Sequence, residues 1–170
     1  MEPFDIVSAT GLGRLNVRCW EPEGAPRAAL LIVHGMAEHI DRYDAFAAFF
    51  AKHGVLVVGA DTASHGKSRQ KDGVKGYFGE KNGWEALISD IHAVVLAIQC
   101  AYKSLPIFLF GHSMGSFLAR SYAARHGEDI NGFIFCGTAG ANPALPIARR
   151  IARHEIRKKG ATAPSPLLNS

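Results

Sequence analysis

The sequence has few cysteines and lacks the features that mark a secreted or membrane-spanning protein. Its three cysteines, Cys19, Cys100 and Cys136, are odd in number and widely separated, and no C-x-x-C pair occurs. This usage argues against a disulfide framework or a zinc site and favours free thiols in a reducing compartment. The first residues have neither a basic start nor an apolar core, and no apolar run reaches the roughly 20 residues that span a bilayer. We therefore expect a cytoplasmic protein.

The net positive charge of the chain comes from one segment. The 170 residues carry a formal net charge of +4, but residues 147–159 alone hold six Lys and Arg residues against Glu155, a local charge of +5. The rest of the chain is close to neutral, at −1. A single basic segment on a nearly neutral body argues against nucleic-acid binding.

Apolar runs alternate with helical patterns along most of the chain. Residues 4–7 and 14–20 predict an antiparallel hairpin around a Gly-rich turn. Four continuous apolar runs predict strands buried on both faces of a parallel sheet, at residues 28–33, 55–60, 105–110 and 132–137.

Helical spacing of apolar residues follows Asp41, Asn82 and Ser113. Asp41 is a candidate cap for a helix whose inner face includes Phe46 and Phe49, and Asn82 with Glu85 has the pattern of a capping box. Strands alternating with helices after an opening hairpin predict an α/β fold with a mostly parallel, doubly wound sheet.

The segment Gly111-His112-Ser113-Met114-Gly115 lies where a predicted strand meets a predicted helix. Its glycines remove the Cβ atoms that would clash where the two elements nearly touch. Such a turn lifts a serine hydroxyl above the sheet edge at a helix N-terminus, which is the nucleophile elbow of the G-x-S-x-G pattern. The alternative for the motif alone is a Gly-rich turn with an incidental serine.

Three loops follow the carboxyl ends of predicted strands, where chemistry gathers in such sheets. They contain His34-Gly35-Met36-Ala37-Glu38-His39 with Arg42-Tyr43, then Asp61 with His65-Gly66-Lys67-Ser68, and then the Gly-His-Ser-Met-Gly segment. These residues resemble the α/β-hydrolase fold and, within it, the monoacylglycerol lipase and lysophospholipase-like branch of serine aminopeptidase-type hydrolases. The resemblance covers residues 28–140 and is looser beyond. The sequence departs from the family at Ser64, where the family usually has glycine.

The resemblance implies a serine hydrolase in which Ser113 attacks an ester carbonyl and forms an acyl-enzyme. The backbone N–H groups of Met114 and Met36 would form the oxyanion hole, with Gly35, Gly111 and Gly115 shaping the two loops. No cofactor and no metal ion is expected.

We expect structural roles for five of the histidines. His34 resembles the family's loop-shaping histidine, and His112 has a structural or pocket-lining role. His39, His65 and His92 lack metal-ligand spacing and are expected to be hydrogen-bonded structural residues.

The acid and the base of a catalytic triad are not recognisable in the sequence. The acids and histidines after Ser113 match neither position of the family: Glu128, Asp129, Glu155, His126 and His154. The family carries both groups on two later strands, so we expect the chain to be the first half of a longer hydrolase and inactive alone. Residues 1–138 would be the N-terminal part of the core, and residues 139–170 the start of a lid.

Several functions remain open at this point. The leading hypothesis is a hydrolase of monoacylglycerols, lysophospholipids or similar acyl esters. The alternatives are an amide hydrolase of the proline iminopeptidase type and a non-catalytic relative that serves as a binding module. Residues 147–159 are either an interfacial helix that contacts anionic lipid or an ordinary solvated face. The sequence does not specify an oligomeric state.

Overall fold

The computed structural model describes residues 6–163 of the chain. These residues belong to two compact units that divide between Thr138 and Ala139. The first unit holds a sheet and its helices, and the second contains the helix α4 (Leu145–Lys159). The interpretation of the second unit as the start of a lid stays a prediction.

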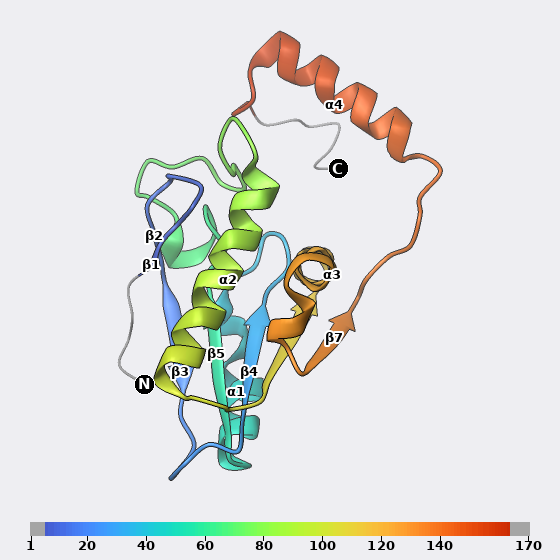
Figure 1. Cartoon of the computed structure of the whole chain (residues 1–170). Coiled ribbons are helices and arrows are strands. Elements are labelled where there is room, and N and C mark those ends of the chain that lie inside the picture. Colours follow the sequence, from blue (N-terminus) through green and yellow to red (C-terminus); the bar gives the residue numbers. More distant parts are fainter. Residues whose placement is uncertain (1–5, 164–170) are drawn as a thin grey trace. The chain divides into compact units, whose positions relative to one another are not determined.

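The first unit is built on a five-stranded sheet (Figure 1). Three neighbouring strand pairs are parallel, and the edge strand β3 runs antiparallel to β5. The spatial order is β3 (Val17–Trp20), β5 (Val55–Ala60), β4 (Ala28–Val33), β6 (Ile107–His112) and β7 (Gly132–Cys136). The predicted α/β architecture with a mostly parallel sheet is confirmed.

Helices cover both faces of this sheet, as the doubly wound prediction requires. Alternate residues of β4 point to opposite faces, so Leu31 packs with α2 and α3, whereas Leu30 packs with α1. The helices are α1 (Asp44–Lys52), α2 (Gly83–Ala101) and α3 (Met114–His126). Single 3₁₀ turns occur at η1 (Ile40–Tyr43), η2 (Gly66–Ser68) and η3 (Gly127–Asp129).

The opening hairpin is shorter than the sequence predicts. Strands β1 (Ile6–Val7) and β2 (Arg14–Leu15) pair antiparallel, but the predicted strand 14–20 is interrupted at Asn16. Its second half is β3, which leaves the hairpin to pair with β5 in the main sheet. Residues 4–5 of the predicted first strand lie outside the described residues.

Three helix-level predictions are wrong. Asp41 does not cap α1, because it lies inside η1 and the residue before α1 is Tyr43. Asn82 precedes α2 but has a φ of 53° and makes no side-chain capping bond, because a capping residue needs an extended backbone. The predicted inner face of α1 includes Phe49, which is 58% exposed; its ring instead packs against Phe50 and His53 along the outside of the helix.

Helix α2 is long and apolar enough to cross a membrane by length and composition alone. Its buried residues pack against the sheet, and one of them is the acid Asp90. Asp90 accepts hydrogen bonds from the hydroxyl of Ser8 and the backbone N–H of Ala9 at 2.7 Å. This packing is that of a core helix in an α/β layer.

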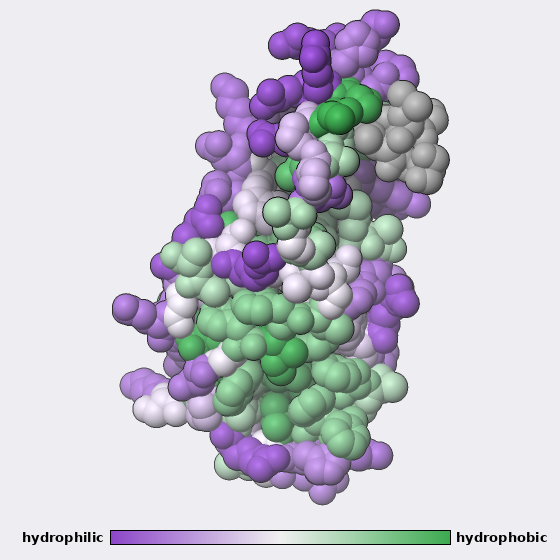
Figure 2. Space-filling model, turned by 90° about the vertical axis from the view of Figure 1, so that its right-hand side faces the viewer, coloured by the Kyte–Doolittle hydropathy of each residue, from purple (hydrophilic) through white to green (hydrophobic). Residues whose placement is uncertain are grey.

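Apolar side chains remain exposed on the strands farthest from β3. Phe108, Ile134 and Phe135 each expose more than a third of their surface. Figure 2 shows a broad apolar surface on the side of the molecule that carries β7 in Figure 1. A groove of about 410 Å³ on the face covered by α1 includes Leu30, Phe108 and Ile134.

Candidate active site

Ser113 occupies a sharp turn between β6 and α3. It has a φ of 51° and a ψ of −118°, a left-handed conformation that costs a non-glycine residue energy. The turn is held on both sides, because the Ser113 N–H donates to Cys136 O at 2.9 Å and its carbonyl accepts from Ser116 Oγ at 2.6 Å. The strained strand–turn–helix junction is the geometry of a nucleophile elbow.

Close backbone packing makes this turn possible. A Cβ atom on Gly115 would lie 2.0 Å from the carbonyl oxygen of Val33 at the end of β4. A Cβ on Gly111 would lie 2.4 Å from the carbonyl oxygen of Gly115. Both predicted elbow glycines therefore stand where the elbow helix, its own strand and the neighbouring strand touch.

The loop after β4 lies against the elbow. A Cβ on Gly35 would be 3.1 Å from the Cβ of Ser113, so the two loops that the sequence predicts to cooperate are in contact. The side chain of Met36 is 65% exposed. Its N–H makes no hydrogen bond to any residue in the range 6–163, and Met114 is the first residue of α3, whose N–H has no partner within the helix.

Glu38 joins this loop to the elbow. One carboxylate oxygen, Oε1, accepts hydrogen bonds from the N–H of Gly35, the hydroxyl of Tyr43 at 3.0 Å and Nδ1 of His112 at 3.0 Å. The other oxygen pairs with Arg42 at 3.3 Å. Because a carboxylate only accepts, Nδ1 of His112 carries the proton. Glu38 thus connects His112, the residue before Ser113, to Gly35 in the loop after β4.

The Glu38 carboxylate is stabilised in its charged form. Burial by itself raises its pKa, but hydrogen bonds from His112, Gly35 and Tyr43 outweigh burial and leave the pKa below its ordinary value. Burial, together with the charge of Glu38, raises the pKa of Tyr43, so its hydroxyl remains a donor at neutral pH.

His34 shapes the base of the same loop. The ring is fully buried, with Nδ1 2.7 Å from Gly35 O and Nε2 2.9 Å from the N–H of Thr62. Nδ1 donates to the carbonyl and Nε2 accepts, which requires a neutral ring, and burial lowers the pKa of His34 accordingly. Both nitrogens are engaged in loop contacts, in keeping with the predicted loop-shaping role.

Asp61, at the carboxyl end of β5, ties three segments together. Its Oδ1 accepts from the N–H of Ile40 at 2.8 Å, and its Oδ2 accepts from the N–H of Lys67 at 2.8 Å and from Asn16 Nδ2 at 2.9 Å. The side chain therefore braces the loop 61–68 rather than joining the Ser113 turn.

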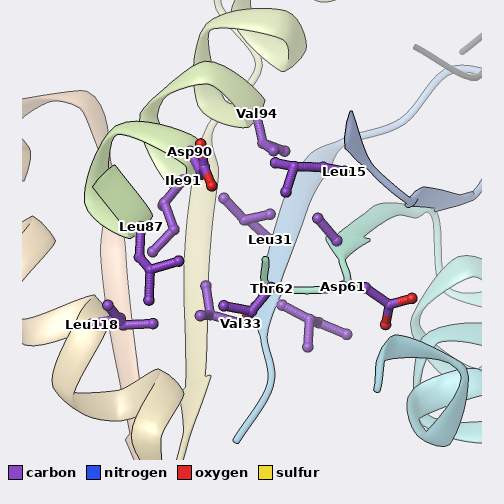
Figure 3. A pocket seen from close by; sticks show the side chains of 12 residues that line it. Leu15, Leu31, Val33, Asp61, Thr62, Leu87, Asp90, Ile91, Val94 and Leu118 are labelled. Atoms are coloured by element: carbon purple, nitrogen blue, oxygen red, sulfur yellow. The ribbon is translucent and has the colours of Figure 1, made fainter. Parts of the chain in front are cut away.

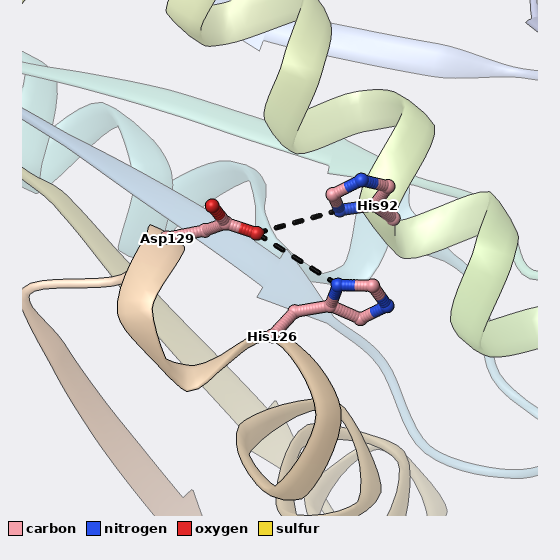
Figure 4. Close-up of side chains that lie close together, drawn as sticks. All are labelled: His92, His126 and Asp129. Carbon is pink, nitrogen blue, oxygen red and sulfur yellow. Dashed lines mark ion pairs between the residues drawn. The ribbon is translucent and has the colours of Figure 1, made fainter.

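Two residues that follow Ser113 within the first unit group with a residue of another helix. His126, at the end of α3, and Asp129, in η3, lie beside His92 of α2 (Figure 4). The sequence did not predict this grouping, because the three residues come from separate elements. His154 and Glu155 lie in α4, in the second unit.

A small cavity lies behind the site, between α2 and β4 (Figure 3). It holds about 30 Å³ and is lined mainly by apolar side chains such as Leu15, Leu31 and Val94. This space suits about one water molecule and is far below the roughly 300 Å³ of small-molecule sites.

Comparison with known proteins identifies the family of the chain. Residues 24–169 match the family model described as Hydrolase_4, serine aminopeptidase, S33. The chain belongs to this family. The monoglyceride lipase of Rattus norvegicus is 33% identical over 129 residues, which are 76% of this chain and 40% of the lipase. The monoacylglycerol lipase of Mycolicibacterium smegmatis is 28% identical over 151 residues, 85% of this chain and 52% of that protein.

Solved structures confirm the α/β-hydrolase fold. A thermostable carboxyl esterase from Bacillus coagulans, solved in complex with glycerol, has a TM-score of 0.84 at 33% identity and matches 92% of this chain and 50% of its own. A lipase solved in its open form has a TM-score of 0.82 at 30% identity, over 97% of this chain and 53% of its own. The chain thus spans about half the length of the relatives it matches, and the predicted resemblance to lipase-like hydrolases is confirmed.

Proposed function

We propose that the protein containing this chain is a serine hydrolase that cleaves carboxylic esters through an acyl-enzyme on Ser113. The observation that carries the proposal is the strained Ser113 turn in contact with Gly35 of the loop after β4. Monoacylglycerols, lysophospholipids and similar acyl esters are the proposed substrates, supported by the monoglyceride lipases among the relatives.

In the proposed reaction, the Ser113 hydroxyl oxygen attacks the ester carbonyl while its proton passes to a general base. The negative charge that forms on the carbonyl oxygen is stabilised by hydrogen bonds from the backbone N–H groups of Met36 and Met114. Collapse of the intermediate breaks the bond to the leaving alcohol, which takes up the proton, and water then hydrolyses the acyl-enzyme. Losing one such donor raises the barrier by about 3 kcal/mol.

We propose that the acid and base of the triad come from chain beyond Ser170. This is supported by the placement of His126 and Asp129 beside His92 instead of Ser113, and by relatives about twice as long. An unactivated serine is a weak nucleophile, so these 170 residues alone should show little or no turnover.

Glu38 is the proposed positioning residue of this site. It acts through its neighbours, because its bonds to Gly35 and His112 hold the oxyanion loop at a fixed place relative to the elbow. Fixed donors stabilise a transition state because they need no reorganisation when the charge forms.

Hydrolysis assays on the intact protein test the proposal. We expect release of fatty acid from a monoacylglycerol, abolished by Ser113→Ala and unaffected by Ser121→Ala, a matched serine-to-alanine control on α3. Preferential cleavage of an N-terminal proline amide would favour the peptidase alternative. The family description, serine aminopeptidase, supports testing this alternative. Absence of both activities would favour a binding module.

Helix α4 is the proposed contact with lipid. Its apolar residues Ile147, Ile151 and Ile156 are exposed, and its remaining surface is rich in arginine and lysine. A basic amphipathic helix of this kind binds anionic interfaces. We expect the intact protein to co-sediment with anionic vesicles, and reversal of charge at Arg149, Arg150 and Arg153 to reduce binding; equal binding by this variant would refute the contact.

The proposed location is the cytoplasm. Cys19, Cys100 and Cys136 are all free thiols in the structure, which supports a reducing compartment.

A further inference from the structure

Three metal-ligating side chains meet on the helical layer formed by α2 and α3 (Figure 4). Nδ1 of His92 lies 3.6 Å from Oδ2 of Asp129, and Nδ1 of His126 lies 3.9 Å from the same oxygen. The three potential ligand atoms all lie within 4.8 Å of one another. We propose that His92, His126 and Asp129 form a binding site for a divalent transition-metal ion, with Zn²⁺ as the preferred occupant.

Two of the three separations are close to those around one shared ion, and the third, between the ligand nitrogens of the two histidines, is no more than 4.8 Å. Zinc binds imidazole nitrogen and carboxylate oxygen at about 2.0–2.2 Å, so tetrahedral angles place two ligand atoms about 3.4 Å apart. The measured 3.6 and 3.9 Å exceed this value by only a few tenths of an ångström. A small inward movement of the carboxylate or of the rings closes the difference.

The two imidazoles must turn slightly to share an ion. Their rings stack with centroids 4.2 Å apart and planes 19° apart, so their nitrogen lone pairs lie in nearly parallel planes. Binding requires each ring to rotate toward the point between them, and the terminal torsion of histidine has a broad well that permits this. The side chains of His92 and His126 are 29% and 34% exposed, which leaves room for rotation and a path for the ion.

The donor set selects the class of metal. Two imidazoles and one carboxylate suit Zn²⁺, Ni²⁺ or Cu²⁺, whereas Mg²⁺ and Ca²⁺ prefer oxygen ligands alone. Three protein ligands leave a fourth position for water.

Tyr122 supplies an outer partner for the bound state. Its hydroxyl is 3.1 Å from Nδ1 of His92 and 3.5 Å from Oδ2 of Asp129. When the ion takes the lone pair of His92, the hydroxyl can donate to Asp129 instead. A hydrogen bond of this kind holds a metal-binding carboxylate in its orientation.

The site is separate from the proposed chemistry. Ser113 immediately precedes α3 and His126 is the last of its 13 residues, so they are about 20 Å apart along the helix. An ion here would join α2 to the end of α3 and to η3, and would therefore stabilise the folded helical layer without taking part in hydrolysis.

Calorimetric titration of the intact protein with ZnCl₂ tests the proposal. Cys100→Ser and Cys136→Ser are included in the background, because both thiols are exposed and could bind zinc themselves. We expect one saturable site and a higher melting temperature with Zn²⁺ but not with MgCl₂. His126→Gln and, separately, Asp129→Asn should weaken binding by about 100-fold, since even outer partners are worth about 10–100-fold.

The control is His53→Gln, which removes an imidazole from the end of α1 on the opposite face of the sheet. It should leave zinc affinity unchanged, and circular dichroism should show all variants folded. Undiminished zinc binding in both His126→Gln and Asp129→Asn, or no saturable zinc binding by the parent chain, would overturn the proposal. The three residues would then connect the helices by polar contacts without binding a metal ion.

Discussion

Replacement of Glu38 tests whether one carboxylate holds the loop after β4 against the Ser113 turn. Glu38→Gln retains a carbonyl acceptor for Gly35 but loses the charge that strengthens the bonds from Tyr43 and His112. A charge-assisted bond contributes about 1 kcal/mol more than a neutral one, so this variant should lose about 2 kcal/mol of unfolding free energy. Glu38→Ala also leaves the buried N–H of Gly35 without an acceptor and should lose about 4 kcal/mol.

The assay is urea unfolding followed by circular dichroism at pH 7. The control is Glu85→Gln, because Glu85 is an exposed carboxylate that also pairs with an arginine, at 2.7 Å. Exposed pairs of this kind contribute about 0.5 kcal/mol, so the control should differ little from the parent. A Glu38→Ala variant as stable as the control would refute the bracing role.

The penalty of Glu38→Gln should also depend on pH. The folded-state pKa of Glu38 is lowered, so its ionised form contributes stability that is fully present above the unfolded-state value of about 4.3. That contribution is lost as pH falls through the lower folded-state pKa. The stability gap between parent and variant should therefore be largest near pH 7 and smaller at pH 3.5; a gap that widens in acid would contradict the assignment.

Three further substitutions test local geometry by the same unfolding measurement. Ala37 has a φ of 58° on an exposed part of the loop, so Ala37→Gly should stabilise the chain by about 1 kcal/mol, whereas the matched Ala124→Gly within α3 should destabilise it by about 1 kcal/mol. If both substitutions changed the stability in the same direction, the result would contradict the argument that Ala37 is strained. Gly115→Ala should cost about 3 kcal/mol, because its Cβ would meet the backbone oxygen of Val33; a neutral effect would show that α3 can shift. Asp61→Asn should cost about 2 kcal/mol, because an amide has only one acceptor oxygen for the three donors around it, and a stable variant would argue against the brace.

The strands and the elbow could be predicted because their signals are contiguous in the sequence. The apolar runs at 28–33 and 55–60 correspond to β4 and β5 residue for residue, since strands buried on both faces show no alternation. The Ser113 turn could be predicted because its glycines permit a close strand–helix junction that side chains would block.

Local backbone choices were harder to predict. Asn82 has a side chain suited to capping, yet its left-handed conformation prevents the capping bond. Ser64 stands where the family usually has glycine and still adopts a φ of 63°, with its hydroxyl bonded to the carbonyl of Tyr77. The bond between Ser64 and Tyr77 joins residues 13 positions apart, which a local sequence pattern does not show.

Side-chain networks between distant segments were not predicted at all. Glu38 and His112 are 74 residues apart, and no spacing rule links them. His92 was assigned as a structural residue without metal-ligand spacing, but α2, α3 and η3 bring it to His126 and Asp129. Such groupings depend on how helices pack on the sheet, which short motifs do not encode.

Covalent labelling of the intact protein with a fluorophosphonate tests the central claim most directly. The electrophile reports a serine that is activated and faces an oxyanion hole, and peptide mass spectrometry identifies the modified residue. We predict one phosphonylated residue, Ser113, with no labelling of Ser113→Ala and full labelling of Ser121→Ala. An intact, folded protein that remains unlabelled, or is labelled at another residue, would contradict the assignment of Ser113 as the nucleophile.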